Sequence, residues 1–229
     1  MHIHGWTIAA ALLLSGCQGQ AQAPAPEPSD AAPASAVAPQ GPERRILAFG
    51  DSLFAGYRLG RNQGYPERLQ AALRARGINA HVTNAGVSGD TTADGRQRFQ
   101  FVLGGMIPGP DLVIVELGGN DLLRGLPPAE TRANLKAILE PLRQHHVAIV
   151  LMGMRAPPNM GPEFQRAFDS IYPELAKEYG ATLVPFFQAP VYDKPALLQA
   201  DHVHPTAQGV DALVAATVDA VAGALPKAG

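Results

Sequence analysis

The feature that most constrains the fold is an alternation of short apolar runs with longer segments of helical spacing. The run Leu112–Leu117 is apolar except for Glu116, which is typical of a central strand buried on both faces. Similar runs predict further strands over 45–49, 80–83, 147–152 and 182–184. Helices are predicted over 65–76, 92–102, 128–144, 163–179 and 208–224. This alternation predicts a three-layer α/β/α domain with a parallel five-stranded sheet.

Two of the predicted helices contain an internal proline, which has no N–H and crowds the preceding turn. Pro141 is expected to disturb the helix over 128–144. The helix over 163–179 is expected to continue through Pro173 and to end at Gly180.

Composition excludes several classes of protein. The chain has 229 residues, of which 46% are hydrophobic, enough for one domain with a sizeable core. Its net charge is −2 and no basic stripe is present, which argues against a nucleic-acid partner. Neither a His/Cys cluster with metal spacing nor a glycine pattern for nucleotides occurs, so we expect no cofactor and no metal.

The N-terminus reads as a targeting signal. The apolar segment 6–14 is too short to span a bilayer, and Leu14-Ser15-Gly16-Cys17 resembles the bacterial lipobox. We therefore expect 1–16 to be a lipoprotein-type signal peptide and Cys17 to carry a lipid anchor to the membrane. Gln18 resembles lipoproteins sorted to the outer membrane, which would place the protein on its periplasmic face. An ordinary secretory signal, without lipidation, is the alternative, because 1–5 contain no Lys or Arg.

Cys17 is the single cysteine of the chain, so no intrachain disulfide can form. Residues 17–44 are rich in Ala and Pro and predict a flexible linker. At about 3.1 Å per residue, 18–44 would reach roughly 80 Å. The folded domain is expected over 45–229.

Four short polar blocks stand far apart in the chain: Gly50-Asp51-Ser52, Ser88-Gly89-Asp90, Gly118-Gly119-Asn120-Asp121 and Asp201-His202-Val203-His204-Pro205. Three of them follow predicted strands, and the carboxyl ends of parallel strands are where α/β sheets bind ligands. A serine becomes a nucleophile when a base takes its proton, a carboxylate orients that base, and N–H donors stabilise the oxyanion. These blocks contain residue types for all four functions.

In this order, the blocks resemble the SGNH (GDSL) hydrolase family, and its bacterial thioesterase/lysophospholipase/arylesterase branch in particular. The resemblance covers about 46–205 and implies a flavodoxin-like strand order 2-1-3-4-5. It also implies a catalytic triad and an oxyanion hole, which comprise Ser52, Asp201 and His204, and the N–H of Ser52 with Gly89 and Asn120, respectively. Taken alone, Ser52 could be a helix cap, and Gly89 and Asn120 could be turn residues.

The histidine assignment also has a geometric reason. Asp201 and His204 are three residues apart in a turn, so their side chains can meet on one side. His202 is one residue from Asp201 and should point away. We therefore expect His204, and not His202, to be the base, and Asp51 to brace the turn by hydrogen bonds.

The acyl pocket is expected to follow the third and fourth strands. By resemblance to the family, the candidate lining residues are Leu122, Leu123, Met154, Arg155 and Pro157. Methionine adapts to varied chains, and Ala156 would leave room in the groove. This predicts tolerance of bulky or aromatic acyl groups, although ordinary core packing is the alternative for these residues.

The resulting interpretation is a serine esterase that acts on small-molecule or lipid esters, with thioesters as further candidates. Two alternatives stay open. One is an O-deacetylase of cell-envelope polysaccharide, and the other is a lipid-binding lipoprotein without activity. Intact Ser52, Asp201 and His204 argue against the second, since a binder needs no nucleophile.

Overall fold

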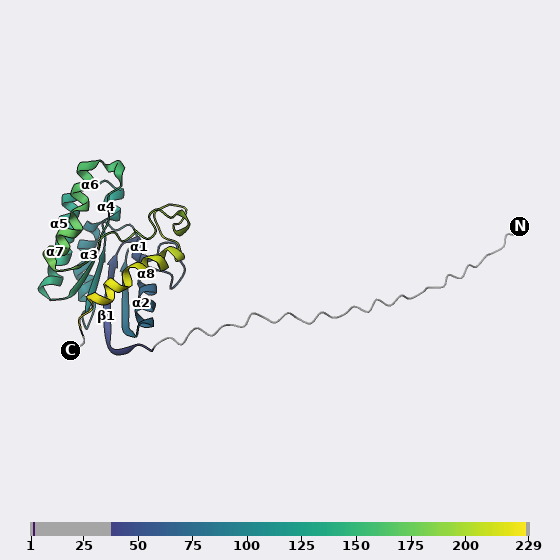
Figure 1. Cartoon of the computed structure of the whole chain (residues 1–229), viewed down its shortest axis with the longest axis horizontal. Coiled ribbons are helices and arrows are strands. Elements are labelled where there is room, and N and C mark those ends of the chain that lie inside the picture. Colours follow the sequence, from purple (N-terminus) through teal and green to yellow (C-terminus); the bar gives the residue numbers. More distant parts are fainter. Residues whose placement is uncertain (1, 3–37, 228–229) are drawn as a thin grey trace. The chain divides into compact units, whose positions relative to one another are not determined.

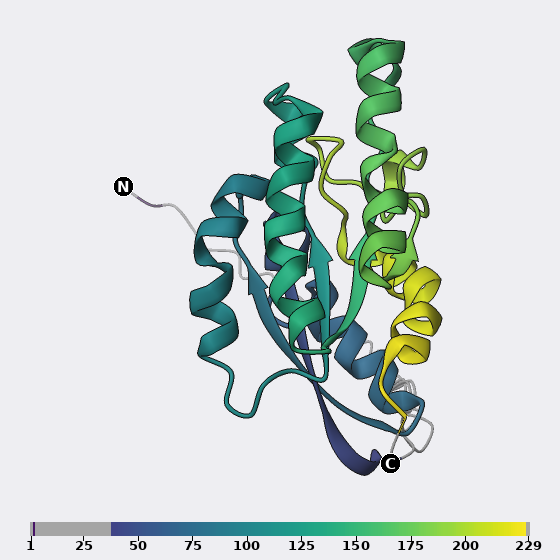
Figure 2. The same ribbon diagram turned by 90° about the vertical axis from the view of Figure 1, so that its left-hand side faces the viewer.

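A parallel five-stranded sheet in the order β2-β1-β3-β4-β5 forms the centre of the domain (Figures 1 and 2). This computed structural model describes residue 2 and residues 38–227. The predicted signal peptide, Cys17 and most of the linker lie outside the described residues. The strands are β1 (Gln40–Gly50), β2 (Ile78–Gly86), β3 (Leu112–Glu116), β4 (Ala148–Met152) and β5 (Thr182–Val184).

Helices cover both faces of the sheet (Figure 1). One face carries α2 (Tyr65–Ala75) and α8 (Ala207–Ala224). The other carries α3 (Thr92–Gly104), α5 (Pro128–Gln144) and α7 (Ile171–Tyr179), with α6 (Pro162–Asp169) beside α5 and α7. Short helices, α1 (Ser52–Ala55) and α4 (Gly119–Leu123), follow β1 and β3, and 3-10 turns occupy Pro158–Met160 and Pro195–Leu197. In the described ranges, every helix is too short or too polar to cross a membrane.

The three-layer fold class and the strand order are confirmed, and some expectations about single elements need correction. The predicted helix 163–179 is two helices, because Pro173 has no N–H for the carbonyl of Asp169, where α6 ends. In contrast, α5 continues through Pro141 without a break. Strand β1 begins at Gln40, within the expected linker, and Gln40 and Arg44 pair with β2 on either side of a register irregularity.

The register of the sheet places three strand ends at one level. Gly50 at the end of β1 lies opposite Gly86 of β2 and Glu116 of β3. A side chain at Gly86 would collide with the backbone, since its Cβ would lie 2.3 Å from the Ala55 nitrogen. Glycine therefore allows α1 to lie directly against the end of β2. The segments that follow these three strands start from neighbouring points on one edge of the sheet.

Candidate active site

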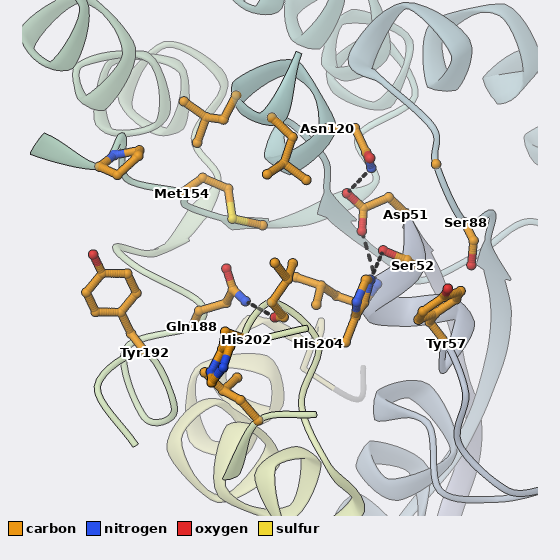
Figure 3. Close-up of a pocket in the computed structure, with 18 of the residues that line it drawn as sticks. Asp51, Ser52, Tyr57, Ser88, Asn120, Met154, Gln188, Tyr192, His202 and His204 are labelled. Carbon is orange, nitrogen blue, oxygen red and sulfur yellow. Dashed lines mark hydrogen bonds between the residues drawn. The ribbon is translucent and has the colours of Figure 1, made fainter. Parts of the chain in front are cut away.

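Ser52, His204 and Asp201 form one hydrogen-bonded chain at the carboxyl edge of the sheet. The Ser52 Oγ lies 2.8 Å from Nε2 of His204, and Nδ1 of the same ring lies 2.9 Å from Oδ2 of Asp201. Figure 3 shows the first of these bonds at the end of a long cleft. Ser52 is the first residue of α1, and Asp51, not Ser52, caps this helix by accepting from the Leu53 N–H. The serine hydroxyl is therefore free to bond the imidazole.

The loop before α8 fixes the position of His204. Asp201 Oδ1 accepts from the N–H groups of Val203 and His204, both at 3.0 Å. Burial would raise the pKa of Asp201, but these two bonds and the His204 side chain outweigh it and lower the pKa to about 2. Asp201 is therefore an anion at neutral pH and holds the Nδ1 side of the ring.

His202 lies in the same loop but takes no part in this chain. Its backbone is in the left-handed region (φ 57°), and its side chain lines the cleft away from the Ser52 bond (Figure 3). The structure thus places His204, and not His202, between the serine and the carboxylate.

Gly89 and Asn120 line the same cleft as Ser52. Gly89 has a φ of +89°, a conformation that glycine adopts without strain. The Asn120 Nδ2 donates to Oδ2 of Asp51 and to the carbonyl of Asp90, each at 3.0 Å. These two bonds hold the amide nitrogen at the rim of the cleft, between the nucleophile turn and the loop of Gly89.

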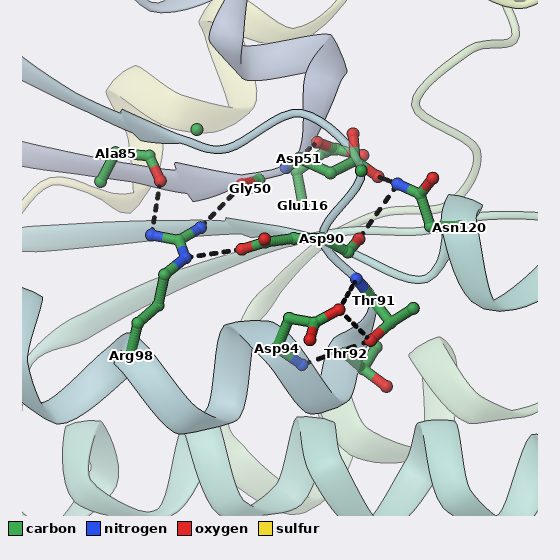
Figure 4. Close-up of polar contacts among 12 residues, drawn as sticks. Gly50, Asp51, Ala85, Asp90, Thr91, Thr92, Asp94, Arg98, Glu116 and Asn120 are labelled. Atoms are coloured by element: carbon green, nitrogen blue, oxygen red, sulfur yellow. Dashed lines mark hydrogen bonds and ion pairs between the residues drawn. The ribbon is translucent and has the colours of Figure 1, made fainter.

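Two buried carboxyl groups, Asp51 and Glu116, lie where β1 and β3 end (Figure 4). Burial raises the pKa of Asp51 to about 6, against the opposing hydrogen bonds of Leu53, Glu116 and Asn120. Burial first, and the charge of Asp51 second, raise the pKa of Glu116 well above its usual value. Glu116 Oε2 accepts from the Asp51 N–H at 3.3 Å, and Oε1 has no hydrogen-bond partner within the described residues. Burial and the charge of Asp51 both favour the protonated form of Glu116. The bonds of Asp51 to Leu53 and Asn120 confirm that it braces the turn.

The cleft has a volume of about 440 Å³, which suits a small organic ligand. The five residues predicted for the acyl pocket all line it: Leu122, Leu123, Met154, Arg155 and Pro157. Leu123 is 69% exposed, whereas Met154 is almost fully buried and also belongs to the core. The expectation that Ala156 leaves room in the groove is wrong, because Ala156 is buried and does not line the cleft. Its N–H donates to Oδ1 of Asp169.

Sequence reasoning missed several other residues of the cleft: Tyr57, Gln188, Tyr192, Leu198 and Val203. The ring of Tyr57 lies 4.4 Å from that of His204, and its place one turn after Ser52 was a usable signal. Gln188 and Tyr192 belong to a loop without a motif, so nothing in the sequence marked them. Across residue 2 and residues 38–227, no three His, Cys, Asp or Glu side chains are grouped as metal ligands.

Comparison with known proteins agrees with this geometry. Residues 48–212 match the family model of the GDSL-like lipase/acylhydrolases. The "thioesterase 1/protease 1/lysophospholipase L1" of Escherichia coli (strain K12) is 41% identical over 160 residues, which cover 70% of this chain and 74% of that protein. Esterase TesA of Pseudomonas aeruginosa is 36% identical over 195 residues, covering 85% and 89%.

Solved structures give the same result. The crystal structure of AlinE4, described as an SGNH-hydrolase family esterase, is 62% identical with a TM-score of 0.69, and the match covers 82% of this chain and all of that one. A crystal structure of TesA has a TM-score of 0.74 at 35% identity, covering 80% and 100%.

The buried acid generates a prediction about stability. Because the pKa of Glu116 is raised by folding, the unfolded chain loses this proton first, so stability is lost as the pH rises above the unfolded pKa. We expect Glu116→Gln, which keeps the shape and the acceptor for Asp51, to gain stability over the wild type between about pH 5 and pH 8. Urea unfolding at both pH values measures the difference.

Glu43→Gln is the matched control, because Glu43 is exposed at the other end of β1. Its stability should follow the wild type at both pH values. Equal pH dependence for Glu116→Gln and the wild type would contradict a raised pKa of Glu116.

Proposed function

Because this chain belongs to the GDSL-like lipase/acylhydrolase family and is a carboxylic ester hydrolase, we propose that Ser52 is its nucleophile, His204 its base and Asp201 the orienting carboxylate. The observation that supports these assignments is the continuous hydrogen-bonded chain from Ser52 Oγ through the ring of His204 to Asp201. This is the arrangement that serine hydrolysis needs.

In the first half of the reaction, the Ser52 oxygen attacks the ester carbonyl carbon, and its proton passes to Nε2 of His204. The negative charge of Asp201 stabilises the imidazolium that forms. The carbonyl oxygen becomes an oxyanion, and the donors proposed for it are the N–H groups of Ser52 and Gly89 and the amide of Asn120. Asn120 donates by sharing or exchanging one of its two present bonds.

The tetrahedral intermediate then expels the alcohol, or the thiol of a thioester, which takes the proton from His204. The acyl group stays on Ser52 as an ester. In the second half, His204 takes a proton from water, which attacks this ester through a second oxyanion. The carboxylic acid leaves, and the proton returns to Ser52.

The shape of the cleft indicates the substrate class. Apolar side chains, among them Leu122, Leu123 and Met154, line the cleft that contains Ser52, so an acyl chain or aromatic ring fits there. Relatives are named esterase, arylesterase and thioesterase/lysophospholipase, which agrees with an apolar acyl site. The proposed substrates are small-molecule or lipid esters with apolar acyl groups, and thioesters of the same acyl groups.

The cellular setting is part of the proposal. Residues 1–16 direct export as a lipoprotein-type signal peptide, and Cys17 carries the lipid. Residues 17–44 link Cys17 to the hydrolase domain. This domain was expected over 45–229, and its first strand starts at Gln40. The support is the short apolar segment and the lipobox-like sequence before Cys17. The enzyme then faces the periplasm from the outer membrane.

The triad assignment predicts a graded set of losses. Ser52→Ala should lose p-nitrophenyl ester hydrolysis by at least about 10³-fold and should no longer react with a fluorophosphonate probe. Asp201→Asn should lower kcat by about 10²–10⁴-fold with the fold intact. His204→Ala should behave like Ser52→Ala, while the matched variant His202→Ala should stay within about tenfold of the wild type. Unchanged activity of Ser52→Ala, or the reverse order of the two histidine variants, would refute the assignment.

The apolar cleft predicts broad acyl tolerance. Values of kcat/KM for p-nitrophenyl butyrate, octanoate and benzoate should be no lower than about a tenth of the value for the acetate. Leu123→Ala should lower kcat/KM for the octanoate ester, because each methylene that is buried contributes about 0.8 kcal/mol. It should leave kcat/KM for the acetate ester unchanged. A sharp preference for acetate would instead favour the deacetylase alternative.

Lipidation of Cys17 predicts the fate of a point variant. The wild-type chain expressed in a Gram-negative host should fractionate with membranes, and Cys17→Ser should move to the soluble fraction or keep its signal peptide. Mass spectrometry of the N-terminal peptide checks the modification. A mature wild-type chain that starts elsewhere, or that carries an unmodified Cys17, would disprove it.

A further inference from the structure

Arg98 connects the loops at the carboxyl edge of the sheet, although it does not line the cleft. It lies in the second turn of α3, and its guanidinium points away from that helix toward the carbonyls of Ala85 and Gly50 (Figure 4). Nε donates to Oδ2 of Asp90 at 2.6 Å, Nη1 to the carbonyl of Ala85 at 2.9 Å, and Nη2 to the carbonyl of Gly50 at 3.0 Å. One side chain thus binds three separate segments.

Each acceptor belongs to a segment that leads to a proposed oxyanion donor or is bonded to one. Gly50 is two residues before Ser52, and its carbonyl also accepts from the Val87 N–H. Ala85 is near the end of β2, in the segment that leads to Gly89. Asp90 follows Gly89, and its backbone carbonyl accepts from Nδ2 of Asn120. A shift of the guanidinium would therefore move all three donors.

The site is built for an arginine. The guanidinium lies 4.1 Å from the centroid of the Phe49 ring, which supports its flat face. The side chains of Arg98 and Asp90 are 20% and 11% exposed, so the ion pair is shielded from water. A lysine has one nitrogen and could not reach three acceptors in these directions at once.

We propose that Arg98 is a positioning residue that holds the N–H of Ser52, the N–H of Gly89 and the amide of Asn120 at the spacing a tetrahedral oxyanion requires. Displacement of catalytic groups by about 1 Å can lower turnover about 10²-fold, so the effect should appear in kcat. Substrate binding in the apolar cleft should change little, since Arg98 does not line it. The inference rests on the proposed oxyanion hole and extends it.

The fold has other bonds that keep α3 in place without Arg98. Thr91 and Asp94 form a capping box at its start, and the Thr92 N–H donates to Asp121 at 2.8 Å. Asp121 also accepts from the Thr131 hydroxyl on α5. Loss of the three Arg98 hydrogen bonds should therefore loosen the segments of Gly50, Ala85 and Asp90, while α3 keeps its place in the fold.

Arg98→Lys is the principal test, because it keeps the charge that pairs with Asp90. We expect kcat for p-nitrophenyl butyrate to fall at least about tenfold, with KM within about threefold of the wild type. The inhibition constant of an alkylboronic acid, which forms a tetrahedral adduct with a serine, should rise by about the factor by which kcat/KM falls. If Arg98→Lys does not fold, Asp90→Asn, which weakens the same pair, takes its place with the same expectations.

Arg45→Lys is the matched control. Arg45 is on the same strand as Gly50 but at the opposite edge of the sheet, where it donates to the Gly109 carbonyl and pairs with Asp111. Both variants should lose thermal stability, and only Arg98→Lys should lose kcat and boronate affinity. A folded Arg98→Lys with kcat within about twofold of the wild type would overturn the inference. Ser52→Ala, measured in parallel, distinguishes failure of this inference from failure of the proposed function. Retained activity of Ser52→Ala would overturn the proposed nucleophile and not the role of Arg98.

Discussion

The carboxyl edge of the sheet, where the cleft of Ser52 lies, depends on the in-register pairing of β1 with both of its neighbours. Gly50 lies opposite Gly86 on one side and Glu116 on the other, so three strands end at one level. The residues of β1 and β3 beneath these ends are completely buried and form the rigid centre of the core. Segments that are distant in sequence must therefore begin side by side, and Ser52, Gly89 and Asn120 reach one cleft without any long-range signal in the sequence itself.

The level strand ends also bring unfavourable neighbours together. Asp51 caps α1 and accepts from the Asn120 amide, so one carboxyl group joins the turn of Ser52 to α4. Burial raises the pKa of Asp51, and burial of Glu116 together with the charge of Asp51 raises the pKa of Glu116. An apolar pair in place of Asp51 and Glu116 would stabilise the fold more, but it would not hold the turn of Ser52 by hydrogen bonds. Such a loss of stability is common at functional sites. Arg98 is a further charged group at this edge of the sheet, where its shielded guanidinium donates to backbone carbonyls of β1 and β2.

Sequence patterns predicted the elements well where local and tertiary preferences agree. The bounds of α5 and β5 were predicted residue for residue, since apolar period and end signals coincide there. The break between α6 and α7 was missed because the apolar spacing continues across Pro173 while the hydrogen-bond ladder does not. Residues of the site that belong to motifs could be named in advance, but Gln188, Tyr192 and Arg98 could not. Their importance arises from contacts between separate loops, which no spacing along the chain encodes.

The imidazole reaches the site by a different route from the nucleophile. His204 belongs to a loop, and local bonds to Asp201 set its turn, which explains why a five-residue motif can specify it. The loop is joined to the nucleophile side by Gln199, whose Nε2 donates to the carbonyls of Tyr57 and Pro205, both at 2.9 Å. The ring of Tyr57 then lies against that of His204. The Ser52–His204 distance is thus set where this loop meets the end of α1, whereas the positions of Ser52, Gly89 and Asn120 are set by the sheet. A change in the loop should consequently affect proton transfer and leave the proposed oxyanion donors in place.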